Sequence, residues 1–275
     1  MHDLLLNPAI QSGILPALAA LLVLALVRQT SALVLVPMAG FLTVVMLAVG
    51  FSLEPMTARS KVVACVLAAG ALALAIDLLR PREVLLVRAA VAALTAAAAV
   101  WVAFRVLQQK EGSALFAQGA GVVLFALVMV ESSRAVAGDS LRGLVVGTLL
   151  GFTSGALGLL GASSSAAFMG IALGASYGAA LLVQMWRGRS SATLDQLVLP
   201  AAVFSVLGGL MACLTGELPW YALLPLPLIP WVARTMSRPT APAWRDALVT
   251  GFSALVPAIV AVGLAYWSAG GRSGA

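Results

Sequence analysis

Histidine and cysteine are almost absent from this chain. The single histidine, His2, leaves no histidine pair for a haem, no metal cluster and no serine–histidine dyad inside the apolar segments. Cys65 and Cys213 form no CxxC motif and have no nearby histidine, so they cannot build a structural metal site. No GxxxxGKS/T stretch is present for nucleotide binding. We therefore expect no catalytic residues, no metal and no cofactor, and we predict that the protein is not an enzyme.

Charge is equally scarce. Only 9% of the 275 residues are charged whereas 62% are hydrophobic, a composition far outside that of soluble domains. The net charge of +6 comes from residues scattered over short loops, which indicates contact with lipid headgroups and argues against nucleic acid as a partner. Because no basic segment precedes the first apolar run and no cleavage site follows it, we expect that run to be retained.

The apolar runs have the length of membrane spans. A spanning helix needs about 20 mostly apolar residues, and charges and turn residues divide this chain into runs of that size. The sequence therefore predicts an all-α polytopic integral membrane bundle, a single transmembrane domain over 1–275 without a soluble linker. A five-plus-five division near residue 138 would make an inverted repeat, although the two halves show no visible match. The ten predicted spans are 10–27, 31–52, 61–79, 84–105, 114–131, 141–160, 164–186, 196–215, 218–234 and 246–267.

The basic residues predict the orientation of these spans, because Lys and Arg are retained on the cytoplasmic side. Alternate loops hold 11 and 5 of them, which puts both termini outside a bacterial-type inner membrane. The larger set is Arg28, Arg80, Arg82, Arg88, Arg134, Arg142, Arg187, Arg189, Arg234, Arg238 and Arg245, and the smaller is Arg59, Lys61, Arg105, Lys110 and Arg272.

The ninth predicted span contains Pro219, Pro225, Pro227 and Pro230, and an ordinary helix does not tolerate three prolines in six residues of its interior. This segment must be kinked or partly unwound if it crosses the membrane. If it is re-entrant, the last span and the C-terminus reverse their orientation.

Glycine crowds the sixth and seventh spans. Small residues four apart let two helix backbones approach closely, so the spacing predicts a tight hairpin of these two spans. The glycines are Gly143, Gly147, Gly151 and Gly155 in the sixth span, and Gly170, Gly174 and Gly178 in the seventh. Such a surface serves helix packing or a homo-oligomer seam, or it lines a permeation path in which hydroxyls and backbone carbonyls replace water around a solute.

Polar groups at membrane depth are candidates for such a path. Asp77 and Glu131 are the two acidic residues in the spans, and each precedes an arginine by three residues on one helix face. An interfacial ion pair is one interpretation of each, and proton coupling, with Glu131 preferred, is the other. The remaining candidates are Thr153, Ser154, Ser163, Ser164, Ser165, Ser176, Tyr177 and Gln184.

Two functions fit these features. The first is a transporter or channel that moves a small solute or ion, with its path near the glycine-rich spans and the proline-broken span. The second is a non-catalytic scaffold subunit whose glycine faces bind the helices of a partner subunit. The expected partners are membrane lipids, a small solute or ion, and a second copy or another membrane subunit.

Overall fold

The computed structural model describes residues 7–27, 32–50, 52, 54, 56–79, 84–161, 163–188, 196–215, 218–236 and 241–270. All regular secondary structure in these residues is helical. Six helices are long and apolar enough to cross a membrane: Ala58–Leu79, Leu85–Leu107, Gly112–Val136, Ser140–Leu160, Ser164–Arg187 and Ala243–Ala269. Three shorter apolar helices are Ile10–Leu26, Leu35–Val49 and Leu199–Leu214. The protein is thus a helical bundle with six candidate transmembrane helices, compatible with an integral membrane protein.

In chain order, the elements begin with the π-helical turn η1 (Ile10–Ile14) and end with the longest helix, α11 (Ala243–Gly270). Between them lie α2 (Leu15–Leu26), α3 (Leu35–Val44), η3 (Val45–Val49), α4 (Ala58–Leu79), α5 (Val84–Leu107), α6 (Gly112–Ser133), η4 (Arg134–Val136), α7 (Ser140–Leu160), α8 (Ser164–Arg187), α9 (Leu199–Leu214), η5 (Trp220–Ala222) and α10 (Leu228–Thr235).

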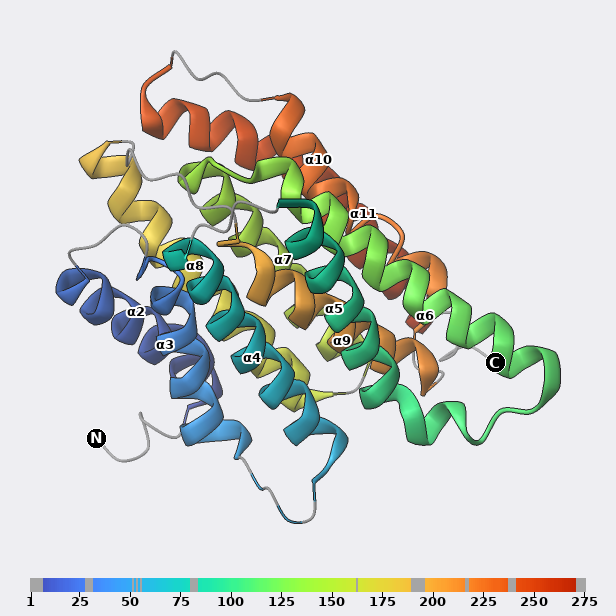
Figure 1. Ribbon diagram of the computed structural model, residues 1–275. Coiled ribbons are helices and arrows are strands. Elements are labelled where there is room, and N and C mark those ends of the chain that lie inside the picture. The colour runs from blue at the N-terminus through green and yellow to red at the C-terminus, as the bar shows by residue number, and fades with distance from the viewer. Residues whose placement is uncertain are drawn as a thin grey trace.

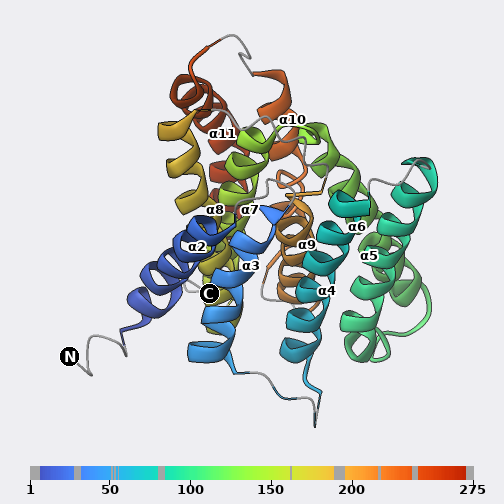
Figure 2. The ribbon, with the colours of Figure 1, turned by 60° about the vertical axis from the view of Figure 1, so that its left-hand side comes forward.

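The hairpin of α7 and α8 forms the middle of the bundle (Figure 1). Helices α2 and α3 pack on α8, whereas α9 and α11 pack on α7. Helix α9 in turn contacts α4, α5 and α6, so α5 and α6 lie on the side opposite to α2 and α3 (Figure 2). Helices of the first half of the chain therefore pack directly on helices of the second half. The single-domain assignment and the division near residue 138 stay predictions.

The segment of the ninth predicted span is broken at its prolines. After η5, five residues form consecutive turns before α10 begins at Leu228. Amide groups in this stretch bond to carbonyls three residues earlier, as from Leu226 to Leu223 and from Leu228 to Pro225, both at 3.0 Å. Pro230 lies in the first turn of α10, where a missing amide hydrogen leaves no helical bond unmade. Most of the segment is buried in the protein, so its irregular backbone is kept away from lipid.

Candidate functional site

The glycines of α7 and α8 face one another across the hairpin. A Cβ atom built on Gly170 would lie 2.5 Å from the nitrogen and 2.6 Å from the Cα of Gly155. One built on Gly151 would collide with the nitrogen of Gly174, and one on Gly158 would lie 2.8 Å from the nitrogen of Ala167. Because the two backbones touch, no space for a solute is left between the helices at this level.

Three other glycines of the two helices meet side chains, and Gly174 meets both the ring and the backbone of Phe152. A Cβ on Gly147 would lie 2.5 Å from the ring of Tyr177, and one on Gly143 would lie 3.1 Å from Leu197. Gly174 meets Phe152, whose backbone nitrogen is 2.8 Å from the built Cβ. Gly178 has an ordinary contact, at 3.5 Å, with a methyl group of Thr148. The close approach therefore extends from the turn, at Gly158, to the middle of the hairpin and relaxes toward the end of α8.

Several polar candidates form hydrogen bonds between helices. The Ser154 hydroxyl donates to the Ser205 hydroxyl of α9 at 2.7 Å, and that hydroxyl donates to the Ala201 carbonyl at 2.8 Å. The Tyr177 hydroxyl donates to the Leu197 carbonyl at 2.7 Å, just before α9. All these side chains are buried. They join α7 and α8 to α9 and hold the middle of the bundle together.

Two further candidates have the same kind of role. The Gln184 amide donates to the Ser140 hydroxyl at 2.7 Å and so joins the end of α8 to the start of α7. Ser176 donates to the Ala172 carbonyl at 2.6 Å and points toward the Pro16 carbonyl of α2, 3.4 Å away. Thr153 is 5% exposed, among packed side chains. No local sequence pattern marks Ser140 or Ser205 as a hydrogen-bond partner, because each bonds to a helix that is distant in the chain.

A cavity of about 330 Å³ lies beside the turn of the glycine hairpin. It is bounded by the start of α4, the end of α7, the start of α8 and the end of α9. Its polar side chains are Arg59, Ser163, Ser165 and Thr215. The remaining lining residues are Ala58, Val62, Gly158, Gly161, Ala166, Met169, Phe204, Gly208, Met211 and Ala212, so no residue of η5 or α10 contributes.

The lining is electropositive. Helices α4 and α8 both begin at the cavity, and the amide groups in the first turn of a helix carry a partial positive charge. Ser163 caps α8 by accepting from the Ala166 amide at 3.4 Å. The exposed Arg59 adds a full positive charge, and its guanidinium donates to the Val49 carbonyl at 3.0 Å. None of the lining residues that the structure describes is acidic. This arrangement suits an anion or the negative end of a polar solute.

Sequence reasoning selected Ser163 and Ser165 but missed Arg59 and Thr215 as neighbours of these serines. Ser164, the third serine of the turn, is exposed and does not line the cavity. Arg59 was counted only as a loop charge, because nothing local places the start of α4 beside the start of α8. The sequence places Arg59 just before an apolar run, and this position at a helix start was the signal available for it.

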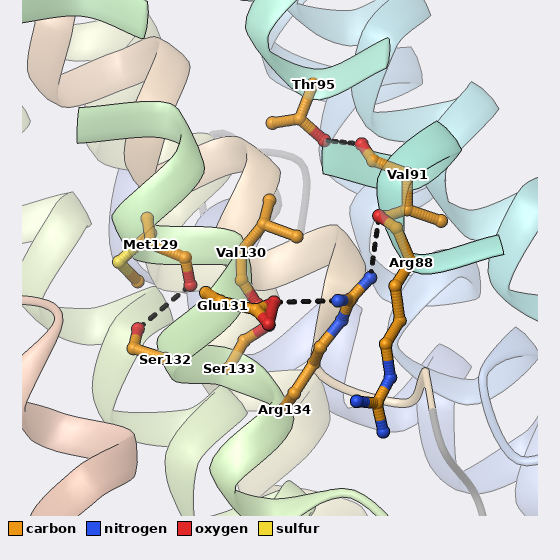
Figure 3. A network of polar contacts seen from close by, with 9 residues as sticks. All are labelled: Arg88, Val91, Thr95, Met129, Val130, Glu131, Ser132, Ser133 and Arg134. Atoms are coloured by element: carbon orange, nitrogen blue, oxygen red, sulfur yellow. Dashed lines mark hydrogen bonds and ion pairs between the residues drawn. The ribbon is translucent and has the colours of Figure 1, made fainter. Parts of the chain in front are cut away.

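The acidic candidates lie elsewhere. Glu131 is 63% exposed at the end of α6 and forms the ion pair with Arg134 that the spacing predicts, at 2.7 Å. The other arm of the Arg134 guanidinium donates to the Arg88 carbonyl at 2.9 Å, which ties α6 to α5 (Figure 3). Asp77 is 7% exposed within α4. Its predicted partner, Arg80, lies outside the described residues.

Within the part of the chain that the structure describes, no group of three or more His, Cys, Asp or Glu side chains is placed to hold a metal ion. Cys65 and Cys213 are both free thiols. Comparison with protein family models, curated proteins and solved structures found no match to this chain.

Proposed function

We propose that this chain is a transporter that moves a small anion or anionic solute across a bacterial-type inner membrane. The observation that carries the proposal is the cavity at the turn of the glycine hairpin, where Arg59, two helix N-termini and three hydroxyl groups converge and no described lining residue is acidic. Hydroxyls and first-turn amides can replace the water around an anion, and a cationic side chain compensates its charge.

The proposal includes ten membrane crossings with both termini outside, as the arginine count predicts. On that topology the cavity faces the outer side, since it lies at the start of α4 and at the turn between α7 and α8. The three shorter apolar helices and the broken segment of η5 and α10 then supply the remaining four crossings. A reporter enzyme that works only outside the cytoplasm should be active when it is fused to either terminus. If instead a reporter that works only in the cytoplasm is active at the termini, the topology is reversed and the cavity faces the inner side.

The glycine hairpin has a structural role in this proposal. Because α7 and α8 touch backbone to backbone, they form a stiff wall, and the path begins at the end of that wall. The proline-broken segment stays part of the proposed path, since α10 packs against α7 and α11, and η5 packs against α11. The same hairpin contact weighs against the scaffold alternative, because the facing glycines at its middle are occupied within the chain and leave no groove there for a partner helix.

Binding and flux test the proposal separately. We would measure the unfolding temperature of the purified protein in detergent with sodium chloride, nitrate, acetate and phosphate at one ionic strength. An anion at about ten times its dissociation constant adds about 1.4 kcal/mol to the free energy of unfolding, which raises the unfolding temperature by a few degrees. The Arg59→Gln variant should lose this response. Arg105→Gln, which removes an exposed arginine outside the cavity, should keep it.

The anion that binds would then be loaded into proteoliposomes containing either variant. We expect efflux with the Arg105→Gln protein and little efflux with the Arg59→Gln protein. If all four sodium salts raise the unfolding temperature equally, the anion does not determine the stabilisation and the anion assignment is wrong. Binding at Arg59 without efflux from vesicles would instead contradict transport and favour a binding or scaffold role.

A further inference from the structure

A second hollow lies between α4 and α5, on the lipid-facing side of the bundle. Its volume is about 270 Å³ and its lining is entirely apolar. Each helix contributes residues spaced three, four and seven apart, so one continuous face of each borders the groove over about two turns, or about 10 Å. The lining residues are Leu72, Ala75, Ile76 and Leu79 of α4, and Val87, Ala90, Val91 and Leu94 of α5.

The groove exists because these two helices pack mainly on other partners. Helix α4 packs mainly on α9, whereas α5 packs mainly on α6. The two therefore diverge, and the large side chains at the rim remain open: Leu79 is 78% exposed and Leu94 is 57% exposed. An apolar groove two turns long, open along its side toward lipid, matches a segment of an extended hydrocarbon chain.

A positive charge lies at one end of this groove. Arg88 is exposed, follows the lining residue Val87 directly and lies in the second turn of α5. Figure 3 shows its side chain running past that of Arg134 in the opposite direction, so that its guanidinium lies beyond the Arg134 guanidinium. Arg134 is compensated by Glu131 through their 2.7 Å ion pair, whereas Arg88 forms no ion pair with any residue that the structure describes. Asp77, in the same region of α4, is buried and does not line the groove.

We propose that this groove holds one acyl chain of an anionic phospholipid whose phosphate binds at Arg88. Among the described charged side chains beside Arg88, Arg134 is compensated by Glu131, so the charge of Arg88 is left for a singly charged headgroup. The arginine count also predicts that this end faces the cytoplasm, the side whose leaflet attracts basic residues through anionic lipids. This site is separate from the proposed anion cavity, which lies at the start of α4 rather than at its end.

Native mass spectrometry of the full chain in detergent tests the site. Phosphatidylglycerol and phosphatidylcholine with the same acyl chains would be titrated against each variant. We expect the wild-type protein to bind phosphatidylglycerol more tightly than phosphatidylcholine. Arg88→Gln should weaken phosphatidylglycerol binding about fivefold and leave phosphatidylcholine binding unchanged, since one arginine near the surface supplies about that much attraction. Arg245→Gln, an exposed arginine of α11 on the same predicted side, is the matched control and should bind as the wild type does.

The groove is tested independently of the charge. Ala90→Trp fills it from an exposed position, whereas Ala89→Trp adds the same side chain to a neighbouring exposed position that does not line it. We expect the first to weaken binding of both lipids and the second to change neither. Equal phosphatidylglycerol affinities for the Arg88→Gln and Arg245→Gln proteins would overturn the headgroup assignment. Equal affinities for the two tryptophan variants would overturn the acyl-chain assignment.

Discussion

Adding one methyl group at Gly170 is the sharpest test of the bundle's middle. In the structure that methyl would lie 2.5 Å from the nitrogen of Gly155 and 2.9 Å from the carbonyl oxygen of Gly151. Ordinary carbon contacts lie near 3.5 to 4.0 Å, so α7 and α8 must separate by about 1 Å. The atoms in the way belong to backbone, which cannot rotate aside as a flexible side chain does.

The expected magnitude follows from two opposing effects. Overpacking of a well-packed site costs up to about 3 kcal/mol. Replacing a helical glycine by alanine returns about 1 kcal/mol through helix propensity. We therefore expect Gly170→Ala to lower the free energy of unfolding by about 2 kcal/mol. For a chain of this size, that change corresponds to a fall of about 4 to 8 °C in the unfolding temperature.

Gly178→Ala is the matched control, because it lies two turns further along the same helix. Its added methyl would meet only Thr148, whose methyl group is 3.5 Å away. Because alanine favours a helix more than glycine does, the variant should be as stable as the wild type or slightly more stable. Gly263→Ala in α11 adds a methyl with nothing within 4 Å and should behave likewise. Tryptophan fluorescence during heating in detergent measures all three. If Gly170→Ala unfolds at the same temperature as Gly178→Ala, the backbone contact between α7 and α8 is wrong.

Three further substitutions test individual contacts by the same unfolding measurement. Tyr177→Phe leaves the buried Leu197 carbonyl without its hydroxyl donor, and we expect a loss of about 1 kcal/mol; an unchanged unfolding temperature would refute the bond. Ser154→Ala removes the hydrogen bond to Ser205 and should cost less, about 0.6 kcal/mol, as is typical between helices in membranes. Glu131→Gln breaks an exposed ion pair and should change the unfolding temperature by no more than about 1 °C, so a larger fall would show that the pair is structural.

Helix positions that depend on neighbouring residues were predictable from the sequence. The predicted span 164–186 and the observed Ser164–Arg187 agree because Ser163 is a cap signal and Arg187 ends the apolar run. The break in the ninth predicted span also follows from local chemistry, since closely spaced prolines remove amide donors wherever the segment lies. What the prolines do not specify is whether the segment crosses the membrane, and the count of ten crossings stays a prediction.

Contacts between distant segments were not predictable. Ser154 and Ser205 are 51 residues apart, and each is a single serine in an apolar helix without any pattern that names its partner. Arg59 and Ser163 line one cavity because α4 and α8 begin at the same end of the bundle, which follows from the packing of the helices and not from either sequence segment.

The glycine spacing itself was compatible with a solute path and with close packing, and the two uses exclude each other at any one level of a helix. Where glycine backbones touch, a solute has no room, and this contact extends as far as Gly158 and Ala167. Beyond them, at the turn, Ser163 and Ser165 stand at the start of α8 and a cavity opens beside Arg59. A path for an anion is therefore best sought at the end of the hairpin, where Gly158 and Gly161 line the cavity, while the glycines at the middle of the hairpin hold its walls together.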